Sequence, residues 1–191
     1  KDGTASGTIT VNITGTNDTA TVSSATTAVS EGNDAAALNA SGQLTITDAD
    51  AGEAVVVAKD LAGTYGTFHV NADGSWTYTG NGAHNELTAG QQVSDSITVS
   101  SKDGTASGTI TVNITGTNDA PVIISSATTE QIHQGASSLE IGSLFTAAAS
   151  DADAGHVLEY SLVDTRGYFT IDSATGDIGL TKSGAAAIAA D

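Results

Sequence analysis

Residues 102–119 are KDGTASGTITVNITGTND, and residues 1–18 repeat the same eighteen letters. In the later copy the apolar residues Ile110, Val112 and Ile114 alternate with threonine and asparagine. A period of two is expected of a β-strand with one buried face. Because the two copies begin 101 positions apart, which is a common domain length, we expect a chain of tandem repeats.

The duplication divides the chain into three parts. Residues 1–18 are predicted to be the terminal strand of a preceding repeat, residues 19–119 a complete module, and residues 120–191 the start of the next module. If the two modules are alike, the closing strands of the second lie beyond Asp191. The complete module is long enough to bury its own core.

Short strands are predicted throughout the complete module. Apolar residues mark them near Val22 and within 44–46, 55–57, 68–70, 76–78, 97–99 and 110–114. Residues 71–74, Asn-Ala-Asp-Gly, predict a hairpin turn with Gly74 at positive φ. About seven short strands separated by Gly, Asn and Asp predict an all-β fold of antiparallel β-sandwich modules. Trp76 and Tyr78 are expected in the core.

The second module repeats this order of elements with a diverged sequence. Alternation at residues 158–162, and apolar pairs at 169–171 and 178–180, predict three of its strands. Residues 173–176 predict the turn between the last two. The alanine-rich run 184–190 can form a helical turn.

The chain is strongly acidic, with 22 Asp and Glu against 5 Lys and Arg and a net charge of −17. This charge disfavours nucleic acid and anionic membrane surfaces as partners, because both would repel the chain, and we expect no nucleic-acid partner. Cysteine is absent, and no apolar run reaches the roughly 20 residues that cross a bilayer, so no membrane insertion is expected. Hydrophobic content of 39% with strand periodicity argues against disorder.

Enzymatic motifs are missing. The sequence has no G-x-S-x-G, HExxH or phosphate-binding glycine loop. The four histidines share no motif and are expected on the surface or on strand faces: His69, His84, His133 and His156. We therefore expect no catalytic activity.

Two acidic turns are the candidate cation-binding motifs of the sequence. Asp48 and Asp50 lie in DADAG, and Asp151 and Asp153 lie in a second DADAG at the equivalent place. Paired carboxylates on a tight turn repel each other unless a cation binds, and Ca²⁺ takes six to eight oxygen ligands. An EF-hand is excluded because its glycine, its last glutamate and its flanking helices are missing.

Several stretches resemble known repeats. Residues 99–121, VSSKDGTASGTITVNITGTNDAP, resemble the end of a cadherin-type repeat, and residues 64–119 resemble the VCBS repeat through YGTFHVNADGSWTY and GTND. Residues 120–191 are similar to a bacterial cadherin-like module through DADAG, LEYSL and FTIDSATG. Such Ig-like repeats are known from very large secreted adhesins of Gram-negative bacteria, many of them RTX-type proteins exported by type I secretion.

The resemblance implies calcium ions between successive modules. The first junction would use the linker and two turns: Asn17, Asp18, Asp48, Asp50 and Asp103. The second would use Asn118, Asp119, Asp151 and Asp153, with Glu31 and Glu86 from the module above. Two positions depart from the family pattern: Glu86 lies outside the usual acidic motif, and Gln134 stands where Glu31 would align.

The expected function is mechanical. The chain is predicted to be a stretch of calcium-stiffened extender repeats, partnered by neighbouring repeats, in an adhesin secreted to the bacterial cell surface, as in biofilms. A module that binds a sugar or peptide is an alternative, as is a structural filament or surface-layer subunit completed by neighbouring chains. Loops that bind a ligand are expected to differ between repeats, whereas the loops of a spacer are expected to repeat. The duplicated stretch includes a turn and the linker, which favours the spacer.

Overall fold

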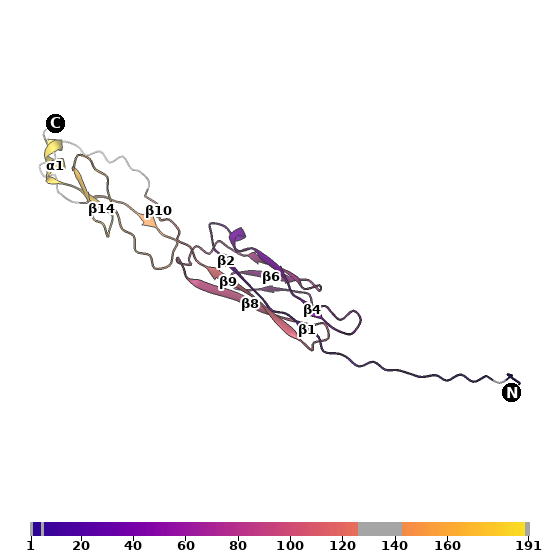
Figure 1. Ribbon diagram of the computed structural model, residues 1–191. Coiled ribbons are helices and arrows are strands. Elements are labelled where there is room, and N and C mark those ends of the chain that lie inside the picture. Colours follow the sequence, from indigo (N-terminus) through magenta and orange to yellow (C-terminus); the bar gives the residue numbers. More distant parts are fainter. Residues whose placement is uncertain (1, 5, 126–142, 190–191) are drawn as a thin grey trace. The chain divides into compact units, whose positions relative to one another are not determined.

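The computed structural model describes residues 2–4, 6–125 and 143–189 (Figure 1). The chain forms two compact units. Unit 1 comprises residues 1–29, 35–82 and 93–114, and unit 2 comprises residues 30–34, 83–92 and 115–191. His133, Gln134 and the last residue of the alanine-rich run, Ala190, lie outside the described residues.

Unit 1 consists of short strands in three sheets. The largest has the order β3-β7-β6-β5, the second the order β2-β9-β8, and the third pairs β1 with β4. The elements are β1 (Thr21–Val22), β2 (Ala25–Ser30), the 3₁₀ helix η1 (Ala35–Leu38), β3 (Ala40–Gln43), β4 (Ile46–Thr47), β5 (Lys59–Ala62), β6 (Gly66–Val70), β7 (Ser75–Gly80), β8 (Gln92–Ser100) and β9 (Ser107–Thr115).

The hairpin of β6 and β7 is the centre of the larger sheet. Its strands are antiparallel, and Phe68 lies opposite Tyr78 with ring centroids 4.7 Å apart. The amide of Gly74 donates to the carbonyl of Asn71 at 3.0 Å, and Gly74 has a φ of 84°. The predicted turn is thus confirmed, since only glycine adopts this conformation without strain.

The core of unit 1 is formed mainly by β6, β7, β8 and β9, because these four strands bury alternate residues. β9 runs between β2 and β8 (Figure 1), and the side chains on its inner face are fully buried. The buried residues of β6, β7, β8 and β9 are Phe68, Val70, Trp76, Tyr78, Ile97, Val99, Ile110, Val112 and Ile114. Expected core positions such as Trp76 and Val112 are therefore confirmed.

One buried carboxylate joins β7 to β8. Asp95 accepts hydrogen bonds from the hydroxyl of Tyr78 at 2.6 Å and from the amides of Thr64 and Tyr65 at 2.9 Å each. Burial, and then the hydrogen bond to Asp95 and its negative charge, raise the pKa of Tyr78 above its usual value, so the phenol remains a donor. Three donors compensate the loss of solvent around Asp95.

Unit 2 contains smaller sheets and a helix. Its strands are β10 (Val122–Ile123), β11 (Ser143–Thr146), β12 (Ala149–Ser150), β13 (Phe169–Ile171) and β14 (Asp177–Leu180), followed by helix α1 (Lys182–Ala189). β10 pairs antiparallel with β12, and β14 lies between β11 and β13. No helix of the described residues is long and apolar enough to cross a membrane.

The all-β prediction is confirmed, but three predicted strands differ. Residues 55–57 make only an isolated bridge between Val56 and Ser101, and the strand of this region is β5. Residues 158–162 form no strand, and neither do residues 2–4 and 6–18. Alternation describes a strand with one buried face, and a strand forms only where a neighbour completes its hydrogen bonds.

Candidate cation site

The acidic turn of unit 2 is held by its own backbone. The amide of Asp153 donates to Oδ1 of Asp151 at 2.9 Å, and Gly155 has a φ of 79°. Asp residues favour such turns because the side chain bonds to the backbone two positions later. The side chain of Asp153 is fully buried and that of Asp151 is 10% exposed. The turn therefore concentrates two carboxylates where little solvent screens them.

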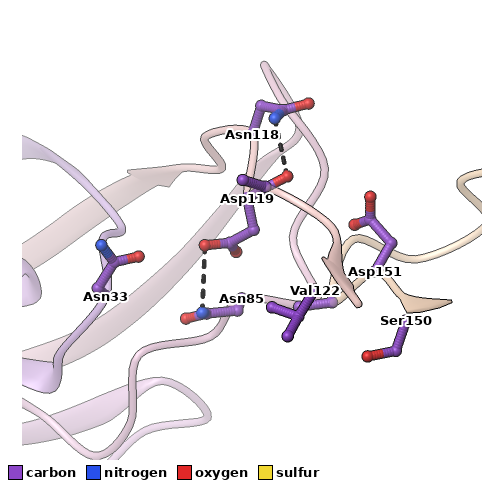
Figure 2. Close-up of a pocket in the computed structure, with 9 residues that line it drawn as sticks. Asn33, Asn85, Asn118, Asp119, Val122, Ser150 and Asp151 are labelled. Atoms are coloured by element: carbon purple, nitrogen blue, oxygen red, sulfur yellow. Dashed lines mark hydrogen bonds between the residues drawn. The ribbon is translucent and has the colours of Figure 1, made fainter. Parts of the chain in front are cut away.

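The linker binds to this turn. The amide of Asp119 donates to Oδ2 of Asp153 at 2.9 Å, and the side-chain amide of Asn85 donates to Oδ1 of Asp119 at 3.2 Å. Asn118 donates from its side chain to the carbonyl of Asp119 at 2.8 Å. Figure 2 shows Asn118, Asn85 and Asp119 connected in this way. The linker and segment 83–92 thus meet at one carboxylate.

A second segment of unit 2 contributes a buried glutamate. Glu31 is 4% exposed, and its Oε1 accepts hydrogen bonds from the amide and the hydroxyl of Thr117 at 2.5 and 2.8 Å. Its Oε2 has no hydrogen-bond partner. Burial, and then the charges of Glu31, Asp153 and Asp151, raise the pKa of Asp119. The carboxylates around Asp119 are therefore mutually repulsive.

Asn85, Asn118, Asp119 and Asp151 border a cavity of about 540 Å³ (Figure 2). The cavity residues with polar side chains come from segments 30–34, 83–92 and 115–119 and from the acidic turn with its preceding serine: Asn33, Asn85, Asn118, Asp119, Ser150 and Asp151. Among the described residues, no lysine or arginine pairs with the carboxylates of this site. The net local charge is therefore strongly negative.

Glu86 lies near the same turn through its backbone. Its carbonyl accepts a hydrogen bond from the amide of Ala154 at 3.3 Å. Its side chain is 61% exposed and pairs with Nδ1 of His84 at 2.9 Å, which lowers the pKa of Glu86. The predicted ligand Glu86 therefore lies in a segment whose backbone reaches the turn, while the structure directs its carboxylate toward His84.

The acidic turn of unit 1 has the same geometry. The amide of Asp50 donates to Oδ1 of Asp48 at 2.8 Å, and the amide of Asp18 donates to Oδ2 of Asp50 at 2.7 Å. Asn17 donates from its side chain to the carbonyl of Asp18 at 2.8 Å and to Oδ2 of Asp103 at 3.0 Å. Hydrogen bonds from Ser101, Thr105 and Asn17 lower the pKa of Asp103. The five residues predicted for this site therefore form one connected network.

Two residues of these turns were missed by the sequence analysis. Carboxylates of Asp48, Glu53 and Asp103 lie within 4.8 Å of one another, as do the ligand atoms of Asp151, Asp153 and His156. Glu53 and His156 each follow the glycine of a DADAG turn. This shared position directly after the glycine was the sequence signal that could have identified both residues.

The donor set fits calcium. Buried oxygens without a hydrogen-bond partner are found in both turns and around the linker: Asp48 Oδ2, Glu31 Oε2, Asn85 Oδ1, Asp119 Oδ2 and Asp153 Oδ1. A buried oxygen without a donor costs about 1–3 kcal/mol, so the protein retains such atoms where something else binds them. Carboxylate and amide oxygens are the ligands that Ca²⁺ prefers.

Comparison with known proteins agrees with this fold. A family model described as "Bacterial cadherin-like domain" matches residues 17–116. No curated protein matches the chain. The crystal structure of human CDH23 EC21-23 superposes with a TM-score of 0.51 at 20% identity, covering 88% of this chain and 56% of that one.

Two other cadherin structures are similar at lower TM-scores. Protocadherin gammaB7 EC3-6, in its cis-dimer structure, gives 0.47 at 20% identity over 94% of this chain and 47% of that one. Mouse cadherin-23 EC22-24 gives a TM-score of 0.46 at 20% identity, covering 86% of this chain and 54% of that one. The chain thus spans about half the length of these structures. At such identities the likeness shows the β-sandwich fold alone.

Proposed function

Since the chain belongs to the bacterial cadherin-like domain family, we propose that its repeats are calcium-stiffened extender modules of a large bacterial adhesin. The family is one of adhesion domains and not of enzymes. The proposed protein is of the RTX type with VCBS-like repeats, secreted to the cell surface. There the repeats hold a distal adhesive domain away from the cell.

One observation carries this proposal: buried oxygens without partners gather around the linker residue Asp119. They belong to Glu31, Asn85, Asp119 and Asp153, which come from three separate segments of unit 2. A cation bound there would hold the three segments together. The sequence repeats the linker and the acidic turn, so an array would repeat the same device.

The carboxylates of Asp119, Asp151, Asp153 and Glu31 would hold the ion, with the amide oxygen of Asn85. Calcium supplies charge neutralisation and multidentate oxygen binding. The backbone amide of Asp119 already fixes Oδ2 of Asp153, so that carboxylate is oriented before any ion arrives. In unit 1, Asn17 orients Asp103 in the same manner. The linkers would then lose freedom, and the array would lengthen.

Thermal unfolding and small-angle X-ray scattering, each in excess calcium or excess chelator, test the proposal. A ligand that binds only the native state stabilises it by about 2.7 kcal/mol at one hundred times its Kd. We therefore expect a higher Tm and a larger radius of gyration in calcium. An unchanged Tm and an unchanged radius of gyration would contradict the proposal.

A matched pair of variants localises the effect. Asp153→Asn keeps the shape of a buried side chain and removes its charge, and Glu159→Gln does the same for an exposed glutamate of the same unit. We expect Asp153→Asn to weaken the response to calcium and Glu159→Gln to leave it unchanged. Equal responses in the two variants would place the ion elsewhere.

A further inference from the structure

The two acidic turns share the backbone hydrogen bond that closes each turn but differ at one ligand position. In unit 1 the amide of Glu53 donates to the carbonyl of Asp50 at 3.2 Å. In unit 2 the amide of His156 donates to the carbonyl of Asp153 at 3.4 Å. The equivalent side chain is thus a carboxylate in one turn and an imidazole in the other.

The imidazole of His156 faces both carboxylates of its turn. Its Nδ1 lies 3.6 Å from Oδ2 of Asp151 and 3.4 Å from Oδ2 of Asp153. Both separations exceed the 2.7–3.2 Å of an N–H···O hydrogen bond. They suit atoms that share one small cation, since tetrahedral ligands at about 2.0–2.1 Å from zinc lie roughly 3.3 Å apart.

A second feature of the turn also indicates a ligand. The side chain of Asp153 is fully buried, and its Oδ1 has no hydrogen-bond partner. Its Oδ2 accepts only the amide of Asp119 among the described hydrogen bonds. The side chain of His156 is 36% exposed, which leaves an approach for a hydrated ion and for water ligands.

Donor type separates the two turns. Calcium takes oxygen ligands, whereas imidazole suits zinc, copper, iron and nickel. The cluster of Asp48, Glu53 and Asp103 offers only carboxylate oxygens. We propose that His156 allows the unit 2 turn to bind a transition-metal dication, represented by Zn²⁺, through Asp151, Asp153 and His156 in competition with calcium, while the unit 1 turn remains selective for calcium. This inference rests on the proposed function in one respect, that the acidic turns bind cations.

Isothermal titration of the whole chain with Zn²⁺ in calcium-free buffer tests the proposal, and added Ca²⁺ should weaken the binding by competing for Asp151 and Asp153. His156→Glu gives unit 2 the side chain found in unit 1, and His156→Gln removes the imidazole without adding charge. Loss of the imidazole should weaken Zn²⁺ binding at least about tenfold in His156→Gln, and His156→Glu, which keeps an oxygen ligand, should weaken it less. The reciprocal variant Glu53→His should gain a Zn²⁺ site.

The exposed cluster of His69, Asp60 and Asn71 is the internal control, because it also places an imidazole beside a carboxylate. His69→Gln should leave the tight Zn²⁺ isotherm unchanged. An isotherm that is insensitive to both His156 variants, or one abolished by His69→Gln, would overturn the proposal. Following the imidazole resonances of His156 by NMR during the titration gives a second readout.

Failure of this inference differs from failure of the proposed function. If Ca²⁺ raises the Tm and the His156 variants leave Zn²⁺ binding unchanged, only the proposed zinc site is wrong. If Ca²⁺ leaves the Tm and dimensions unchanged while Zn²⁺ binding depends on His156, the calcium extender is wrong and the zinc site stands.

Discussion

Residues 1–18 and residues 102–119 have the same sequence, but the described residues of the earlier copy are exposed to solvent and the later copy packs into a sheet. In the later copy Val112 is fully buried in β9, between β2 and β8. In the earlier copy Val11 is 75% exposed, and the described residues of that segment form no strand. Each residue of one copy is therefore a matched control for its counterpart in the other. The comparison teaches that strand pattern and strand formation are separate properties.

The largest difference is expected for Val112→Asp against Val11→Asp. An unpaired charge buried at Val112 should cost about 5 kcal/mol or more, which is comparable to the whole stability of many domains. Unit 1 should therefore unfold. Val11→Asp should change the free energy of unfolding by less than about 0.5 kcal/mol. Urea unfolding followed by the fluorescence of Trp76, which is 3% exposed, measures both. Similar losses in the two variants would mean that residues 1–18 are packed.

Gly108→Ala against Gly7→Ala is expected to give a smaller difference. A Cβ at Gly108 would lie 2.1 Å from the carbonyl oxygen of Ser23, so the backbone must shift. Nothing lies within 4 Å of a Cβ at Gly7. Overpacking costs about 1–3 kcal/mol, and a clash with backbone belongs at the upper end of that range. Unfolding in urea should show this loss for Gly108→Ala alone, and an unchanged midpoint would refute the close approach.

Gly104→Ala against Gly3→Ala tests the turn that precedes the strand. Gly104 has a φ of 77° and Gly3 a φ of 69°, and a Cβ would meet nothing within 4 Å at either. Only backbone strain is changed, and it costs about 1 kcal/mol where packing enforces the conformation. Thermal unfolding should show a lower Tm for Gly104→Ala and an unchanged Tm for Gly3→Ala. Equal Tm values would show that the turn between β8 and β9 relaxes.

The smallest difference concerns pH, in excess chelator. Hydrogen bonds lower the pKa of Asp103, mainly from Ser101 and Thr105, and that of Asp2 through Thr4. A lowered native pKa stabilises the fold above the unfolded value of about 3.9 and loses this effect as pH falls through the native value. Asp103→Asn should therefore be less stable than the wild type at pH 7.

The stability gap between Asp103→Asn and the wild type should close below about pH 4. Among the described residues Asp2 bonds to Thr4 within its own turn, which the unfolded chain can also form, so Asp2→Asn should match the wild type at every pH. Urea unfolding at a series of pH values measures both. A gap that stays constant with pH would show that Asp103 acts through packing.

The paired aspartates of the candidate site could be predicted from spacing, and its linker residues from the family resemblance. The DADAG turns place two aspartates on one tight turn, whereas the expectation that the Asn-Asp linker lies beside each turn came from the resemblance to cadherin repeats. Glu53 and His156 were missed because their side chains reach the site through the path of the backbone after the glycine. The hydrogen bond between Glu86 and His84 could not be predicted either, because it depends on side-chain contacts that the sequence pattern does not determine.

The sequence by itself determined the all-β class, the hairpin at Gly74 and the residues available to each buried face, because these depend on local period and on backbone freedom. Only the tertiary structure decided which copy of the duplicated stretch became a strand. A strand needs neighbours for its amides and carbonyls and a second sheet for its apolar face. Ile110 has both and is fully buried, whereas Ile9 is 90% exposed.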